Sequence, residues 1–222
     1  MNNLKKQYFN HYSTNNFYIY LHILVFRIFK SRLSFFSKIK LQNKKILDLG
    51  CGKSDNFNFF KKLKMKYFGV DIDRRIINNL NKIFKTKNFY QGDNELIPFK
   101  KNYFDFILSI HSFYYLNNKN SNIENHKKEV LRVLKKGGYI VLTLPKNKLD
   151  HYRFNKLKNK KSYQISHDKF NLRNNTFMSK FKNKKQISNF FKKEFKIIDI
   201  GFMDYSIINL SEYHWWCVLK KK

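Results

Sequence analysis

Three short apolar segments that run into acidic residues constrain the fold of this chain more than any other feature. These segments are 45–49, 67–71 and 88–93. They carry Asp48, Asp71 and Asp93 at or just before their ends, and apolar residues at helical spacing lie between them. Alternating strands and helices are typical of a parallel sheet with helices on both faces. The carboxyl ends of such strands converge on one crevice, so we expect the three acids to lie together there.

The rest of the chain continues the alternation. Further strands are expected at 104–109, 139–144, 195–200 and 213–219, and further helices at 124–135 and 185–193. We expect one α/β domain with four parts: an N-terminal helical cap (1–42), a core (43–145), a Lys- and Asn-rich insertion or lid (146–183), and a terminal helix and strand pair (184–222).

The charge of the chain is strongly positive, with 46 Lys and Arg against 15 Asp and Glu and a formal net charge of +31. This surplus could attract nucleic acid or an anionic membrane. However, the chain is rich in Asn, Lys, Ile, Phe and Tyr, which A/T-rich codons encode, and few of its basic residues are Arg. Bidentate recognition of nucleic acid relies on Arg. Coding bias is therefore the favoured explanation, and a nucleic-acid partner is not favoured.

Two further features bear on where the protein acts. Cys51 and Cys217 are the only cysteines, and they provide neither a disulfide framework nor zinc spacing, so we expect a cytoplasmic protein without a metal. The apolar stretch within 17–36 is too short for a transmembrane helix. It fits an amphipathic helix that covers the core, with peripheral membrane contact as the alternative.

The glycine turn after the first strand narrows the choice of ligand. Gly50 and Gly52 begin a dinucleotide fingerprint whose last glycine is missing, and Asp48 and Asp55 would repel a pyrophosphate, which argues against NAD. Residues 52–54 match the end of a phosphate-binding loop, but the full pattern needs glycine where Leu47 stands. Asp71 lies about 20 residues after the turn, the separation expected of an acid that holds ribose hydroxyls.

Five ordered motifs resemble the class I S-adenosylmethionine-dependent methyltransferases, in the subgroup that methylates small metabolites. They are residues 46–52 (ILDLGCG), 69–71 (GVD), 92–99 (GDNELIPF), 104–109 (FDFILS) and 131–138 (LRVLKKGG). The resemblance is close over 44–145 and loose over 185–220. It implies a Rossmann-like, doubly wound sheet of seven mostly parallel strands with an antiparallel last strand. Ser54 departs from the family pattern, which often has a third glycine there.

The resemblance also implies a binding site for S-adenosylmethionine. Its expected members are Asp48, Gly50, Cys51, Gly52, Asp71, Ile72, Asp93, Asn94, Leu96 and Ser109. Asp48 would favour the charged methionine end, and Asp71 would accept both ribose hydroxyls. Asp93 would accept from the adenine amino group while the Asn94 amide contacts the ring. Ile72 and Leu96 would enclose the adenine.

Catalytic residues are less marked. His111 follows the fourth strand, where residues of this family often face the transferred methyl group, and it is the candidate general base. Tyr114 and Tyr115 are candidate walls of the acceptor pocket. The expected acceptor is a small molecule, a sugar or a lipid-linked compound. An RNA methyltransferase and a non-catalytic binding module with the same fold remain alternatives.

Overall fold

The computed structural model describes residues 25, 27–29, 36, 38–146, 152–157, 162–168, 171, 173–207 and 210–222. In this part of the chain, seven strands form one sheet in the order β10-β11-β6-β4-β1-β2-β3. Their bounds are β1 Lys45–Leu49, β2 Lys66–Asp71, β3 Phe89–Gln91, β4 Phe104–Ser109, β6 Leu134–Pro145, β10 Phe195–Ile207 and β11 Leu210–Lys221. The neighbouring pairs from β6 to β3 are parallel, and β11 is antiparallel to both β6 and β10. The expected mostly parallel sheet with an antiparallel last strand is confirmed.

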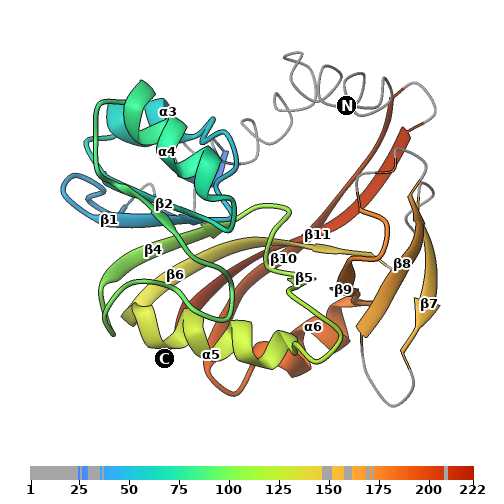
Figure 1. Cartoon of the computed structure of the whole chain (residues 1–222). Coiled ribbons are helices and arrows are strands. Elements are labelled where there is room, and N and C mark those ends of the chain that lie inside the picture. The colour runs from blue at the N-terminus through green and yellow to red at the C-terminus, as the bar shows by residue number, and fades with distance from the viewer. Residues whose placement is uncertain are drawn as a thin grey trace.

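Helices cover both faces of this sheet. Their bounds are α3 Phe57–Lys62, α4 Arg74–Ile83, α5 Ile123–Val133 and α6 Lys184–Phe191. Figure 1 shows α3 and α4 on one face and α5 and α6 on the other, so the sheet is doubly wound as expected. Helix α5 ends two residues, and β6 begins five residues, before the predicted positions, because the strand already pairs at Leu134 with Phe104 of β4.

Alternating side chains of the central strands build two apolar layers. On β1, Ile46 packs in the cluster on the α3–α4 side, whereas Leu47 and Leu49 pack in the cluster on the α5–α6 side. Successive strand residues point to opposite faces, so a strand covered on both sides must be apolar nearly throughout. Asp48 interrupts this apolar run on the α3–α4 side, and it is buried with an exposed fraction of only 4%.

The N-terminal segment supplies side chains to the core. Val25, Ile28, Phe29 and Phe36 are buried in the cluster on the α3–α4 side. The Phe36 ring centroid lies 5.1 Å from that of Phe106 on β4. This packing supports the core-covering interpretation for these positions. The other residues of 1–37, and with them most of the segment considered for membrane contact, lie outside the described residues.

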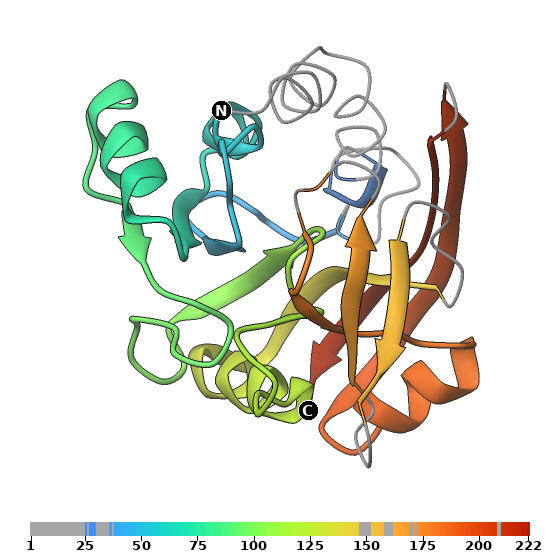
Figure 2. The same ribbon diagram turned by 45° about the vertical axis from the view of Figure 1, so that its right-hand side comes forward.

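A second, smaller sheet takes three of its four strands from the segment 146–183 that was predicted as an insertion or lid. Its four strands are ordered β5-β9-β8-β7, with bounds β5 Tyr115–Leu116, β9 Phe177–Ser179, β8 Ser162–Asp168 and β7 Tyr152–Lys156. Figure 2 shows it standing at an angle beside the main sheet. The strands were not predicted because they are short and half-buried, so no long apolar run marks them.

Replacing Phe36 by alanine tests the role of the N-terminal segment in stability. The ring is 1% exposed, and removal of such a buried phenyl group costs about 3–5 kcal/mol. We expect Phe36→Ala to lower the free energy of unfolding by this amount in urea denaturation. The control is Phe202→Ala, because Phe202 is 61% exposed. Equal losses in the two variants would contradict the packing role of Phe36.

Candidate cofactor and acceptor site

The glycine turn after β1 has two glycines with different surroundings. Gly50 has φ +74°, and a Cβ added there would lie 2.2 Å from the Cβ of Ser112. Gly52 has φ +49°, and no described atom lies within 4 Å of the place where its Cβ would be. Both left-handed conformations favour glycine. Gly50 is therefore packed against the chain itself, whereas Gly52 borders space in which a ligand can approach the backbone.

Asp71, at the end of β2, faces this turn. Its Oδ2 accepts a hydrogen bond from the Gly52 amide at 3.0 Å, and its Oδ1 accepts one from the Asp73 amide at 3.0 Å. Two backbone donors thus fix the plane of the carboxylate. A carboxylate oxygen can accept more than one bond, so each oxygen retains capacity toward a ligand.

Asp48 is buried beneath the turn and held by a chain of hydroxyl groups. The Tyr67 hydroxyl donates to Asp48 Oδ2 at 2.6 Å, and the Ser54 hydroxyl lies 2.7 Å from the Tyr67 oxygen. Burial raises the pKa of Asp48 from its usual 3.8 to about 6, although the bonds from Tyr67 and Asn56 oppose the rise. Ser54, the departure from the family pattern, keeps a left-handed φ of 61°. Its side chain completes the hydroxyl chain that a glycine could not.

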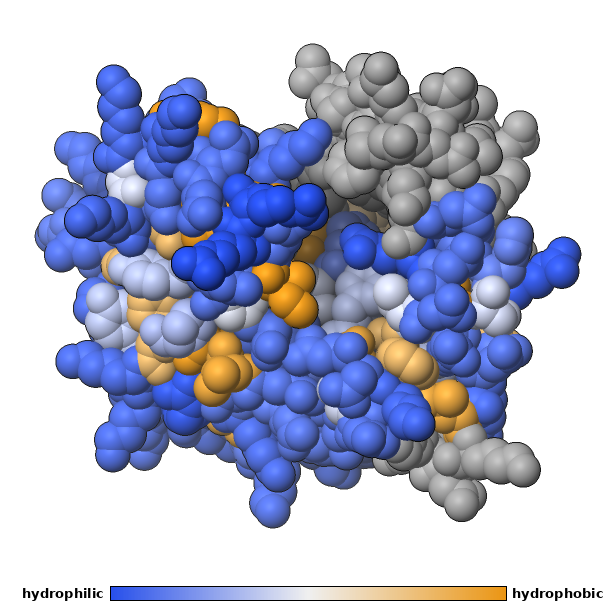
Figure 3. Space-filling view, viewed as in Figure 1, coloured by the Kyte–Doolittle hydropathy of each residue, from blue (hydrophilic) through white to orange (hydrophobic). Residues whose placement is uncertain are grey.

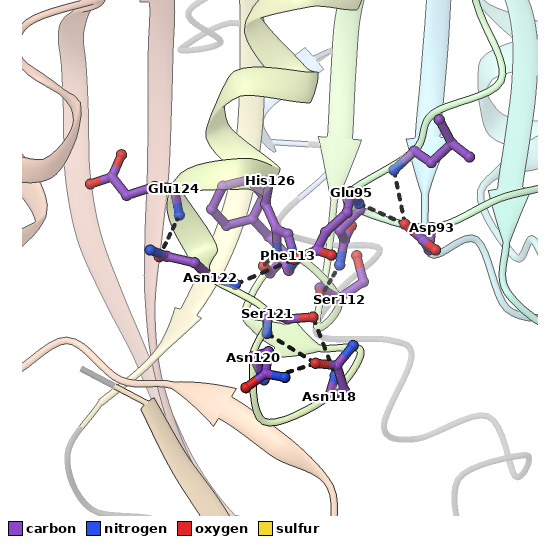
Figure 4. Close-up of polar contacts among 12 residues, drawn as sticks. Asp93, Glu95, Ser112, Phe113, Asn118, Asn120, Ser121, Asn122, Glu124 and His126 are labelled. Carbon is purple, nitrogen blue, oxygen red and sulfur yellow. Dashed lines mark hydrogen bonds and ion pairs between the residues drawn. The ribbon is translucent and has the colours of Figure 1, made fainter. Parts of the chain in front are cut away.

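The loop after β3 presents polar and apolar groups to the same crevice. Asp93 Oδ1 accepts from the amides of Glu95 at 2.7 Å and Leu96 at 2.9 Å (Figure 4). The Asn94 side chain donates to the Ser112 carbonyl at 3.0 Å, which ties this loop to the segment after β4. Leu96 is 71% exposed and Ile72, after β2, is 62% exposed. Two large apolar side chains are therefore left uncovered beside the acids.

Two predicted members of the site, Ser109 and Cys51, lie beneath it. The Ser109 hydroxyl is fully buried, donates to the Leu49 carbonyl at 3.3 Å and lies 2.6 Å from the Ser112 hydroxyl. The Cys51 side chain is buried, and burial raises the pKa of its thiol well above the usual range, so the thiol is protonated at neutral pH. These side chains support the turn from below.

His126 was missed by the sequence interpretation, although it supports the loop after β3. It is fully buried in α5, and its Nδ1 donates to the Phe113 carbonyl at 2.8 Å. Its Nε2 lies 3.8 Å from Glu95 Oε1, which also accepts from the Asn122 amide (Figure 4). The only signal for it was a polar residue on the apolar side of a predicted helix.

His111, Tyr114 and His214 form a polar cluster at the ends of β4, β6 and β11. His111 Nδ1 lies 3.2 Å from the Tyr114 hydroxyl, which lies 3.4 Å from His214 Nε2. The two imidazole rings meet edge to face at 4.3 Å. His111 has φ 53°, and its amide donates to the Thr143 hydroxyl at 2.8 Å. The pairing of β11 with β6, in which His214 lies opposite Pro145, brings His214 here.

The molecular surface is hollowed on the face drawn in Figure 3. Figure 3 shows the hollow between the side carrying α3 and α4 and the side carrying β7 and β8. The described ranges contain no cluster of three or more His, Cys, Asp or Glu that could hold a metal ion. None of the helices described is both long enough and apolar enough to cross a membrane.

Comparison with known proteins shows similarity to methyltransferases. The model of a family described as "Methyltransferase domain" matches residues 47–142. Phthiotriol/phenolphthiotriol dimycocerosates methyltransferase 1 of Mycobacterium ulcerans is 26% identical over 109 residues, which are 47% of this chain and 39% of that protein. The chain thus spans well under half the length of this curated relative. Residues 47–142 match the methyltransferase family, which supports a class I S-adenosylmethionine-dependent methyltransferase.

Solved methyltransferase structures share the fold. A Methanosarcina mazei S-adenosylmethionine-dependent methyltransferase has a TM-score of 0.65 and 18% identity, and the match covers 81% of this chain and 93% of that one. The 1,6-didemethyltoxoflavin-N1-methyltransferase of Burkholderia thailandensis, solved with 1,6-didemethyltoxoflavin and S-adenosylhomocysteine, has a TM-score of 0.56 and 11% identity. That match covers 82% of this chain and 72% of the other.

S-adenosylmethionine is the cofactor of this methyltransferase family, and the residues present fit it. Gly52 borders open space, and Asp71 holds two fixed acceptor oxygens toward that space. Asp93 uses Oδ1 for the loop, and no described residue donates to its Oδ2. The carboxylates of Asp48 and Asp71 also favour a ligand that carries a sulfonium and an ammonium group.

Removal of the buried charge at position 48 should stabilise this methyltransferase. Because the pKa of Asp48 is raised to about 6, its ionisation disfavours the folded state, and each pKa unit corresponds to about 1.4 kcal/mol. We expect Asp48→Asn to increase the free energy of unfolding by about 1–3 kcal/mol at pH 7.5. The gain should decline as the pH falls from about 6 and vanish below about 4. Urea denaturation across this range measures it.

Asp105→Asn is the control, with the opposite expected sign. Partial burial acts to raise the pKa of Asp105, but the Lys45 amide and the Lys135 ammonium outweigh it and lower that pKa. Asp105 therefore stabilises the fold above its unfolded pKa, and this contribution is lost as the pH falls through its lowered folded value. If Asp48→Asn destabilised the protein at pH 7.5 as Asp105→Asn should, the buried charge would not be a cost to folding.

Proposed function

We propose that this protein transfers a methyl group from S-adenosylmethionine to a small-molecule acceptor, with sugars and lipid-linked compounds included in that class. The observation that carries the proposal is the Asp71 carboxylate, held by two backbone amides against the open side of the Gly52 turn. Support for a small acceptor comes from two similar proteins, which are named as methyltransferases of phthiotriol/phenolphthiotriol dimycocerosates and of 1,6-didemethyltoxoflavin.

Each part of the cofactor has a matching group in this proposal. Asp71 accepts from the two ribose hydroxyls, and Asp48 beneath the turn favours the positive methionine end. Asp93 Oδ2 accepts from the adenine amino group, and the Asn94 amide donates to a ring nitrogen. Ile72 and Leu96 bury their exposed apolar surface against the two faces of the adenine. Each contact uses a group that the fold leaves available.

Catalysis requires the chain to position the acceptor, exclude water and remove a proton. Bound S-adenosylmethionine supplies a methyl group that its sulfonium already activates for in-line transfer. His111 is the proposed general base. Burial lowers its pKa from the usual 6.5 to about 4, so its imidazole is neutral at neutral pH and can accept a proton.

Tyr114 and His214 orient this base. With Nδ1 of His111 protonated, the ring donates to the Tyr114 oxygen, and the Tyr114 hydroxyl donates to His214 Nε2. This pattern leaves Nε2 of His111 as the proton acceptor. It also spreads the charge that forms on His111 along a hydrogen-bonded chain. Tyr114 therefore acts as a positioning residue as well as a wall of the proposed pocket, next to the Tyr115 ring at 4.6 Å.

The cofactor assignment is tested by Asp71→Asn. This change replaces one acceptor oxygen by a donor, and hydrogen bonds to charged groups contribute about 1.5–3 kcal/mol each. We expect the affinity for S-adenosylhomocysteine, measured by calorimetry, to fall by roughly 100-fold. The control is Asp73→Asn, which changes the charge two residues away and keeps a good N-cap for α4. Wild-type affinity in Asp71→Asn would refute the assignment.

The role of His111 is tested by His111→Asn. Asparagine tolerates the left-handed φ of 53° better than most residues, so the backbone should be preserved. We expect methyl transfer to an identified acceptor to slow about 100-fold or more, the usual contribution of a general base. Binding of S-adenosylhomocysteine should remain unchanged. Unchanged turnover with normal cofactor binding would assign His111 a purely structural role.

A further inference from the structure

Lys180 lies in an unusual position after β9, with its charge between two aromatic rings. Its Nζ is 3.7 Å from the ring centroid of Phe154 on β7 and 4.1 Å from that of Tyr163 on β8. Among the residues that the structure describes, no carboxylate pairs with Lys180 and no group accepts a hydrogen bond from its ammonium. The side chain is half-buried. The rings attract the cation but leave its three donors without an acceptor.

Among the described lysines that lie over rings, two have carboxylate partners, whereas Lys45, over Tyr103, has none. Lys146, over Phe202, has an ion pair with Asp204 at 2.6 Å. Lys127, over the ring of Phe190, has an ion pair with Glu124 at 2.9 Å. A partly buried cation without such a partner is costly, and this burial lowers the pKa of Lys180 to about 8. An anionic group beside Lys180 would remove that cost.

The backbone around Lys180 is attached directly to the proposed reaction centre. The amide of Ser179 donates to the Tyr114 carbonyl at 2.9 Å, and the amide of Phe181 donates to the Pro145 carbonyl at 3.2 Å. Pro145 pairs with His214 in the sheet. Lys180 is thus held between the two segments that carry the Tyr114–His214 contact, on the side of the second sheet.

A row of aromatic side chains runs from the Tyr114–His214 contact to Lys180. The aromatic row consists of Tyr114, Tyr115, Tyr152, Phe154 and Tyr163. The ring centroids of Tyr114 and Tyr115 lie 4.6 Å apart, and the hydroxyl oxygens of Tyr115 and Tyr152 lie 3.5 Å apart. The ring centroid of Phe154 lies 5.9 Å from that of Tyr152 and 6.1 Å from that of Tyr163. A second cation, the Arg173 guanidinium, lies 4.9 Å over the Tyr115 ring. Aromatic side chains with two cations beside them suit a flat molecule that carries negative charge.

We propose that the methyl acceptor is a planar, anionic small molecule whose carboxylate or phosphate binds the Lys180 ammonium while its ring packs along the aromatic row. This inference rests on the proposed function, because it concerns the acceptor of the same methyl transfer. It narrows the acceptor from small molecules in general to unsaturated ring acids. The net charge of +31 would act at long range in the same direction.

The test compares ring acids with their neutral amides on protein saturated with S-adenosylhomocysteine. Benzoate and benzamide, nicotinate and nicotinamide, and 1-naphthoate and 1-naphthamide are the probes, and calorimetry gives their affinities. We expect the acids to bind about tenfold or more tightly than the amides, since a charge-assisted hydrogen bond contributes about 1.5–3 kcal/mol. Lys180→Met should abolish this preference, and Lys180→Arg should retain it.

Lys182→Met is the matched control, because Lys182 is an exposed lysine two residues along the chain. This variant should still bind the acids more tightly than the amides. That result would attribute the preference to a local contact of Lys180 and not to the overall positive charge of the protein. Equal binding of acids and amides, or equal losses in the two methionine variants, overturns the inference even if S-adenosylhomocysteine binds normally. A short oligouridylate that binds more tightly than every acid and depends on Lys180 also overturns it, in favour of a nucleic-acid acceptor. Failure of S-adenosylhomocysteine to bind wild-type protein would instead count against the proposed function.

Discussion

The hydrogen bond from the Gly52 amide to the Asp71 carboxylate joins the turn after β1 to the end of β2, and the geometry of the proposed cofactor site depends on it. The second oxygen of Asp71 is held by the Asp73 amide at the start of α4. One side chain therefore fixes the relative positions of a strand end, a glycine turn and a helix start. Because its acceptors are oriented before any ligand arrives, little reorganisation is needed on binding.

Stability and binding make opposite demands on Asp48. Burial disfavours its charge and raises its pKa to about 6, whereas in the proposed function that same charge favours a sulfonium ligand. The hydroxyl chain from Ser54 through Tyr67 reduces the conflict by donating to the carboxylate. The position where the family pattern often has glycine thus serves the buried acid in this protein. Residues that lower folding stability are common at functional sites, and interactions elsewhere offset the loss.

Much of the core, and the residues of the proposed cofactor site, could be predicted from local sequence. The apolar strands, the Gly50–Gly52 turn and the acids Asp71 and Asp93 are local features, and parallel strands bring their ends to one edge. Seven strands, the antiparallel last strand and helices on both faces were predicted and are confirmed. The second sheet and the start of β6 were not, because short half-buried strands carry weak periodicity and their pairing depends on distant partners.

The sequence by itself determined the class of fold and the chemistry at the strand ends, because those signals lie within a few residues of one another. Only the tertiary structure placed His214 beside Tyr114 and His126 beside Glu95, since each contact joins elements that are distant along the chain. It also decided that the Ser109 hydroxyl supports the turn from beneath and that Lys180 lies between two rings. Side-chain direction and burial follow from packing, and packing is settled only when all the layers are in place.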